Sequence, residues 1–168
     1  PDTEQLRKSI DEKTRAILVI NPNNPTGSVS SKSTLKKIIN IAGEHNLVVF
    51  ADETYDKLLF DGENFTSMAS IAGDVPVISF GSISKNYLAP GFRGGWLYRH
   101  DPHGVMSDYF EAIKKFARLR LSTVAPVQFA IEAALNGPQD HLAGLVAKLQ
   151  SRRDLTYKRL NGIEGLSC

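Results

Sequence analysis

The sequence predicts an α/β protein with three layers (αβα) and a mostly parallel sheet that includes one antiparallel strand. Three short apolar runs rich in β-branched residues, Ala16–Ile20, Leu47–Ala51 and Val75–Phe80, are typical of strands buried on both faces of a parallel sheet. Helical patterns lie between these runs. A polar cluster follows each run, and ligands of open α/β sheets bind beyond the carboxyl ends of the strands. We therefore expect one site at that edge.

Local signals predict the first helices. Thr3–Lys13 is a short polar stretch with helical character. Ser30 and Ser31 can cap a helix that ends near Gly43 and joins the first two strands. The apolar face of this helix has helical spacing and comprises Leu35, Ile38, Ile39 and Ala42.

The segment after the second strand has weaker signals. Asp61-Gly62 marks a turn and Ser67–Ile71 a helical turn. Gly94–Tyr98 has the pattern of a fourth strand, and its short connection from Lys85 leaves no room for a crossover helix. The fourth strand should therefore run antiparallel to the third.

The last third of the chain is predicted to be helical. Met106–Ala117 and Pro126–Leu135 carry apolar residues at helical spacing, which we interpret as packing surfaces in the core or at a subunit interface. One long amphipathic helix is expected from about Asp140 to Leu160. Its apolar face comprises Leu142, Leu145, Val146 and Leu149.

Composition limits the classes of partner. The 168 residues are 42% hydrophobic, enough for one domain with a sizeable core. Twenty basic and 18 acidic side chains give a formal charge of +2, too balanced to indicate nucleic acid or a membrane as partner. Cys168 is the only cysteine, so we expect no disulfide and a cytoplasmic location. Neither a membrane-spanning run nor a secretory leader is expected. The histidines lack ligand-like spacing and indicate no metal site: His45, His100, His103 and His141.

The chemistry is indicated by the cluster after the third strand. Lys85 stands at the carboxyl end of a buried strand, with Ser82 just before it and Arg93 just after it. An amine, a hydroxyl and a guanidinium in this order can hold a phosphorylated aldehyde, which indicates pyridoxal 5′-phosphate. Lys85 would bond to the aldehyde and later act as the base that moves the substrate proton.

The other strand ends supply the remaining groups that such a cofactor needs. Asp52 would pair with the protonated ring nitrogen, which keeps the ring electron-withdrawing. Asn24 and Tyr55 would donate hydrogen bonds to the ring oxygen. Ser82 and Arg93 would bind the phosphate, Arg93 with a charge-assisted contact. Each residue alone has an ordinary structural explanation, so the interpretation depends on their combination.

The chain resembles the class I/II aminotransferases of fold type I. Four motifs in order carry this resemblance: Asn21-Pro22-Asn23-Asn24-Pro25-Thr26-Gly27, Asp52-Glu53-Thr54-Tyr55, Ser82-Ile83-Ser84-Lys85 and Arg93-Gly94-Gly95-Trp96. The segments Gly137–Leu142 and Arg152–Asp154 are most similar to the alanine- and aspartate-type enzymes of archaea and bacteria. The resemblance implies the same residue roles as the chemical argument, with Lys85 as the covalent lysine.

The resemblance also implies a domain organisation and partners. Residues 1–139 would be part of the cofactor-binding large domain, 140–160 the interdomain helix, and 161–168 the start of a small domain. Family members are substantially longer, so the chain is expected to be a fragment. The implied substrates are an amino acid and a 2-oxo acid, and the implied full-length assembly is a homodimer. A lyase of the same fold and a catalytically silent fragment are the alternatives.

Overall fold

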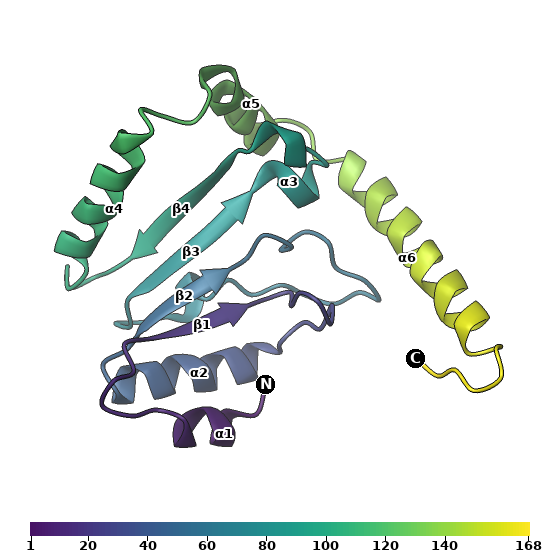
Figure 1. Cartoon of the computed structure of the whole chain (residues 1–168), viewed down its shortest axis with the longest axis horizontal. Helices are drawn as coiled ribbons and strands as arrows, with labels where there is room; N and C mark the ends of the chain where they lie inside the picture. Colours follow the sequence, from purple (N-terminus) through teal and green to yellow (C-terminus); the bar gives the residue numbers. More distant parts are fainter.

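Four strands form one mixed sheet in the order β1-β2-β3-β4 (Figure 1). The structure, a computed structural model, describes all residues from 1 to 168. The strands are β1 (Ala16–Ile20), β2 (Val48–Asp52), β3 (Val77–Ser82) and β4 (Gly95–His100). The first three are parallel, and β4 is antiparallel to β3. The predicted fold class and the antiparallel fourth strand are therefore confirmed.

Six helices and two single 3₁₀ turns complete the chain. They are α1 (Thr3–Lys8), α2 (Lys32–Glu44), η1 (Ala69–Ile71), α3 (Ile83–Asn86), η2 (Pro90–Phe92), α4 (Ser107–Leu119), α5 (Ala125–Asn136) and α6 (His141–Leu160). The first helix is shorter than predicted. It ends at Lys8 because the carboxylate of Asp11 accepts hydrogen bonds from the backbone N–H groups of Lys13 and Thr14, which favours a turn.

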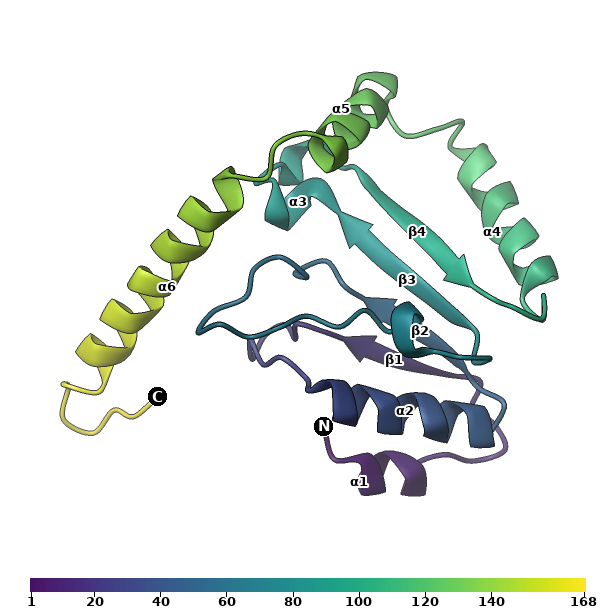
Figure 2. The same cartoon turned by 180° about the vertical axis from the view of Figure 1, so that it is seen from behind.

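The main hydrophobic core lies between α2 and one face of the sheet. Ser31 caps α2 by accepting a hydrogen bond from the N–H of Thr34, as predicted. Leu35 and Ala42 of α2 are fully buried. The strands contribute Ile17, Val19, Val49, Ala51 and Val77 to the same core. Helix α1 packs outside α2, as both views show (Figures 1 and 2).

The opposite face of the sheet is only partly covered. Strand residues alternate between faces, so Leu18, Phe50 and Phe80 lie on the side away from α2. Phe50 stacks against Phe80 at 6.1 Å between ring centroids and meets the ring of Tyr109 edge-on at 6.3 Å. Leu18 is 64% exposed. The third layer of the predicted arrangement is therefore represented on this face by α4.

Most apolar residues of α4 and α5 lie outside the core. No residue of either helix is buried, and Phe116 and Phe129 are 73% and 72% exposed. The interpretation of these stripes as core is correct for Met106, which directly precedes α4 and is 4% exposed, and wrong for the residues on the outer sides of both helices, which lie at the margin of the sheet with no element packed on them (Figure 1). The subunit-interface interpretation stays a prediction.

Helix α6 extends away from the sheet (Figure 2). Its predicted apolar face is confirmed as the half-buried side of the helix. The guanidinium of Arg153 makes two hydrogen bonds to the carboxylate of Asp61, at 2.5 and 2.9 Å, and lies over the ring of Phe60. These contacts tie α6 to the segment after β2. None of the helices has the length and apolar content needed to cross a bilayer.

Candidate active site

The carboxyl ends of three parallel strands remain aligned beyond the sheet. Asp52 pairs with Ile20 of β1 and with Phe80 of β3. The backbone N–H of Asn21 donates to the carbonyl of Asp52 at 3.0 Å, and the N–H of Glu53 donates to the carbonyl of Phe80 at 3.1 Å. The polar clusters after β1, β2 and β3 therefore start side by side, as expected for a parallel sheet.

Lys85 and Tyr55 lie together at this edge. The Nζ atom of Lys85 is 5.5 Å from the centroid of the Tyr55 ring. Lys85 is exposed and belongs to α3, a single turn capped by Ser82, whose Oγ accepts a hydrogen bond from the N–H of Ser84 at 2.9 Å. The sequence motif therefore forms a capped turn that presents the amine beside the aromatic ring.

Asn24 joins Tyr55 in one pocket. Both residues line a cavity of about 300 Å³, together with Pro22, Phe60 and Leu149 of α6. Asn24 is exposed, which leaves its amide available to a ligand. The two predicted ring-oxygen donors therefore share a pocket to which the last helix also contributes.

Asp52 lies on the partly covered face of the sheet, the same face as Phe50. Its Oδ1 atom accepts hydrogen bonds from the N–H of Thr54 at 3.1 Å and the hydroxyl of Thr54 at 2.6 Å. No hydrogen bond or ion pair joins it to Lys85. Thr54 orients the carboxylate, a role that the sequence alone did not indicate.

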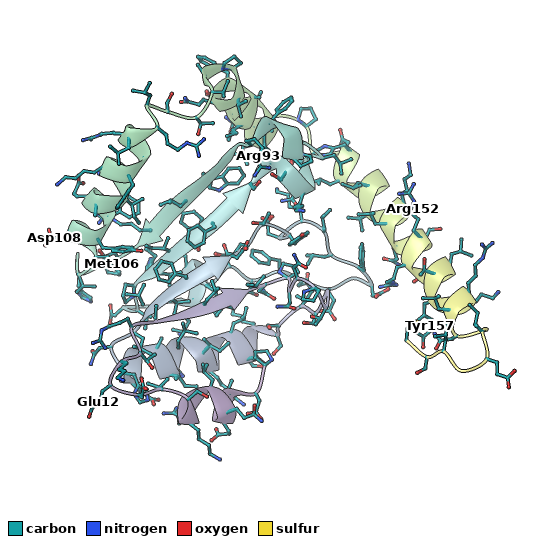
Figure 3. The ribbon with its side chains drawn as sticks, in the orientation of Figure 1. Glu12, Arg93, Met106, Asp108, Arg152 and Tyr157 are labelled. Atoms are coloured by element: carbon teal, nitrogen blue, oxygen red, sulfur yellow. The ribbon has the colours of Figure 1, made fainter.

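Ser82 and Arg93 lie where β3 ends and β4 begins. The hydroxyl of Ser82 is 3.3 Å from the carbonyl of Gly94, next to Arg93. Figure 3 shows Arg93 at this junction, whereas Arg152 lies on α6. The Arg93 guanidinium donates to the carbonyl of Pro90 at 2.7 Å, and Arg93 lines a cavity with residues 120–124 between α4 and α5. Ser82 and Arg93 are therefore brought close through the backbone, without a hydrogen bond between their side chains.

Close approach of β3 and β4 requires glycine at this junction. A Cβ atom on Gly95 would lie 2.8 Å from the carbonyl oxygen of Gly81, and backbone cannot yield as a side chain can. A Cβ on Gly94 would overlap Val127 of α5. The two glycines after Arg93 thus allow β4 and α5 to pack against the strand that carries Ser82.

Sequence reasoning assigned no role to Glu53. This residue is 7% exposed, and its carboxylate accepts hydrogen bonds from the N–H of Met68 at 2.8 Å, the Tyr98 hydroxyl at 3.0 Å and the Ser67 hydroxyl at 3.2 Å. Burial raises the pKa of Glu53, although the three donors partly offset this effect. The alternation of side chains along a strand could have predicted this burial, because it places Glu53 on the opposite face of the sheet from Asp52.

Side-chain and backbone contacts also fix the C-terminal end of α3, the turn that carries Lys85. The side-chain amide of Asn86 donates to the Asp56 carboxylate at 2.6 Å, and the Tyr87 hydroxyl donates to the side-chain oxygen of Gln139 at 3.0 Å. The carbonyl of Asn86 lies 3.2 Å from Nε2 of His141. These partners were not predicted, since they are far apart in sequence. No group of three or more His, Cys, Asp or Glu side chains is placed to bind a metal ion.

Comparison with known proteins identifies the family. The model of the family described as "Aminotransferase class I and II" matches residues 1–168. The chain belongs to this family. It is 41% identical over its full length to the glutamate-pyruvate aminotransferase AlaA of Escherichia coli K12 and 42% identical to an alanine aminotransferase of Mycobacterium tuberculosis H37Rv. The predicted resemblance is confirmed.

Solved structures agree in fold. An alanine aminotransferase from Pyrococcus furiosus is 48% identical, with a TM-score of 0.94 over 99% of this chain. An aspartate aminotransferase variant from Thermus thermophilus is 30% identical, with a TM-score of 0.80 over 96% of this chain. The chain spans 40–42% of the length of the curated relatives named above and 42% of the Pyrococcus chain.

Enzymes of this family use pyridoxal 5′-phosphate, and the residues present fit that group. Lys85 offers a primary amine at the strand edge, beside the Tyr55 ring. Asn24 is available in the adjoining pocket. Ser82 and Arg93, a hydroxyl and a cation, flank the same turn, and such groups suit a phosphate.

Proposed function

We propose that this chain is the cofactor-binding part of an aminotransferase that moves an amino group between a small amino acid, such as alanine or aspartate, and a 2-oxo acid. The observation that carries this proposal is the position of the Lys85 amine, 5.5 Å from the centroid of the Tyr55 ring, at the edge where three strand ends meet. The names of the relatives, alanine and glutamate-pyruvate aminotransferases, support the substrate class.

Each candidate residue has a role in this proposal. The bound cofactor would supply an electron-withdrawing ring next to the substrate α-carbon. Lys85 would hold the cofactor through Nζ and, once free, would move the proton from the substrate α-carbon to the cofactor. Asp52 holds a proton at the ring nitrogen, with its carboxylate oriented by Thr54.

The remaining residues hold the cofactor in place. Asn24 and Tyr55 donate hydrogen bonds to the ring oxygen. Ser82 and Arg93 bind the phosphate. The proposal also includes the large-domain assignment for residues 1–139, the interdomain helix at 140–160, the start of a small domain at 161–168, a cytoplasmic location and a homodimer of the full-length protein. The exposed stripes of α4 and α5 support the dimer.

Covalent capture of the cofactor tests the proposal. The purified chain is mixed with pyridoxal 5′-phosphate, the adduct is fixed with borohydride, and labelled lysines are mapped by mass spectrometry. We expect the label on Lys85 and its loss in Lys85→Ala, whereas Lys57→Ala should keep it. Label spread evenly over surface lysines would contradict the proposal. In the full-length protein, 2-oxo acid formation from alanine and 2-oxoglutarate separates a transferase from a lyase or a silent fragment.

A further inference from the structure

The turn that carries Lys85 cannot fix the amine by itself. Helix α3 has four residues, and an isolated helical turn is unstable in water. Lys85 is exposed, and its side chain makes no hydrogen bond or ion pair. Its contact with the Tyr55 ring at 5.5 Å is a surface cation–π contact, worth about 0.5–1 kcal/mol. The position of the amine must therefore depend on how the backbone of the turn is held.

The residues that directly follow Tyr55 and Lys85 bond to each other. Asp56 accepts a hydrogen bond from the side-chain amide of Asn86 at 2.6 Å, in a partly buried position. Asn86 is 3% exposed. A hydrogen bond to a carboxylate is roughly twice as strong as a neutral one, and shielding from water strengthens it further. This hydrogen bond therefore joins the two chain segments one residue after Tyr55 and one residue after Lys85.

We propose that the Asp56–Asn86 hydrogen bond is a positioning bridge that sets the Lys85 amine over the Tyr55 ring. This inference rests on the proposed function of Lys85 for its catalytic meaning. The bridge fixes the distance between the turn after β2 and the turn after β3, and it leaves Lys85 free to rotate toward a ligand. The side chains of Asp56 and Asn86 bond to each other and make no hydrogen bond or ion pair with the Lys85 amine, so both are positioning residues.

Two further contacts extend the bridge to α6. The carbonyl of Asn86 lies 3.2 Å from Nε2 of His141, the first residue of α6, and the rings of Tyr87 and His141 are 5.4 Å apart. Gln139 accepts from the Tyr87 hydroxyl and donates to the carbonyls of Ala134 and Gly137 at the end of α5. Residues of the α5–α6 connection thus support Asn86 and Tyr87. Among these contacts, Asp56 contributes the only carboxylate.

A cofactor-free measurement tests the position of the amine. Lysines are reductively methylated with ¹³C-formaldehyde, and the Lys85 resonance is assigned by its loss in Lys85→Arg. Protons above an aromatic ring resonate upfield, so wild-type Lys85 should show an upfield shift that Tyr55→Leu removes. Asn86→Asp, which sets two carboxylates against each other, and Asp56→Ala, which removes the acceptor, should each lose at least half of this shift.

Three variants show whether the effect belongs to the bridge. The exchanged pair Asp56→Asn with Asn86→Asp restores one amide donor and one carboxylate, and it should restore the upfield shift. Asp56→Asn alone keeps a side-chain oxygen as acceptor, so this variant should retain the upfield shift. Asp74→Ala removes an exposed carboxylate elsewhere and should leave it unchanged. A folded Asn86→Asp or Asp56→Ala protein with the full shift would overturn the proposal, as would an exchanged pair that fails to restore it.

Covalent capture of pyridoxal 5′-phosphate supplies the functional measurement. A displaced amine should react at Lys85 roughly tenfold or more slowly in Asn86→Asp and Asp56→Ala, because small misplacements of reacting groups cost one to two orders of magnitude. The slow background capture at Lys37, an exposed lysine of α2, is the internal reference. A wild-type chain with the upfield shift but no capture at Lys85 would contradict the proposed function while supporting the bridge.

Discussion

Glu53 shows how one buried carboxylate connects three segments at the strand edge. Its hydrogen bonds reach Ser67 and Met68 before η1, and Tyr98 on β4. Because burial raises its pKa in the folded state, the folded protein holds a proton there more tightly than the unfolded chain. The contribution of Glu53 to stability is therefore fully present below the ordinary glutamate pKa and declines as the pH rises through the folded pKa.

Replacing Glu53 should change this pH dependence. Glu53→Gln has nearly the same shape and does not ionise, so its free energy of unfolding should lack the decline seen in the wild type above about pH 4. Glu53→Ala leaves the buried N–H of Met68 without an acceptor and should lose about 1–3 kcal/mol at neutral pH. Urea denaturation from pH 4 to pH 8 measures both. Equal pH slopes for wild type and Glu53→Gln would contradict the expectation.

The sequence predicted where the candidate residues lie better than it predicted the contacts that support them. The common edge of Lys85, Asp52 and Tyr55 could be predicted because each follows an apolar strand, and parallel strands end at the same edge of a sheet. Asn86 and His141 could not, because their contacts depend on the path of the chain between residues 87 and 140. Thr54 and Glu53 lay within a recognised motif, but their partners become visible only in three dimensions.

Elements were predicted well where one face is buried. The spacing of apolar residues in α2 reflects a core on one side, and the bounds of α2 and the three parallel strands differ from prediction by a few residues at most. The expectation that the strands are buried on both faces is wrong for β1, because Leu18 is 64% exposed. The stripes of α4 and α5 have equally clear periodicity, but large apolar residues such as Phe116 and Phe129 remain exposed. Apolar periodicity identifies a helix face that favours burial, but it does not show whether residues of this chain pack against that face.

Two leucines test the difference between a buried face and an exposed one, because they lie on opposite sides of the sheet. Leu35 in α2 is fully buried and Leu18 in β1 is 64% exposed on the other face. Leu35→Ala should reduce the free energy of unfolding by about 2–5 kcal/mol, and Leu18→Ala by less than about 0.5 kcal/mol. Chemical denaturation of both variants gives the comparison. Similar losses would mean that the partly covered face is packed in solution.

For the whole molecule, α6 is joined to the body of the protein through Asp61. The N–H of Asp61 donates to Gln150 at 3.2 Å, and its carboxylate accepts both hydrogen bonds from Arg153. The guanidinium lowers the pKa of Asp61. The ion pair therefore stabilises the folded arrangement above the ordinary aspartate pKa and loses this effect as the pH falls through the lowered value. Salt should screen it, because both groups are exposed.

Hydrogen exchange at the Asp61 amide reports on this connection. Arg153→Gln should speed exchange of that amide at neutral pH, and 1 M salt should speed it in the wild type more than in the variant. Arg152→Gln is the matched control, since no hydrogen bond or ion pair joins its guanidinium to Asp61. Unchanged exchange in Arg153→Gln would show that the pocket contacts of Leu149 are enough to hold α6.

Strand β1 lies at the rim of the sheet, with β2 on one side and no strand on the other. Its five residues contain neither a charge nor a proline, the usual devices by which proteins discourage strand addition. An extended segment of another molecule can align there and continue the ladder. The isolated polypeptide should accordingly be prone to ordered association through β1 as its concentration rises.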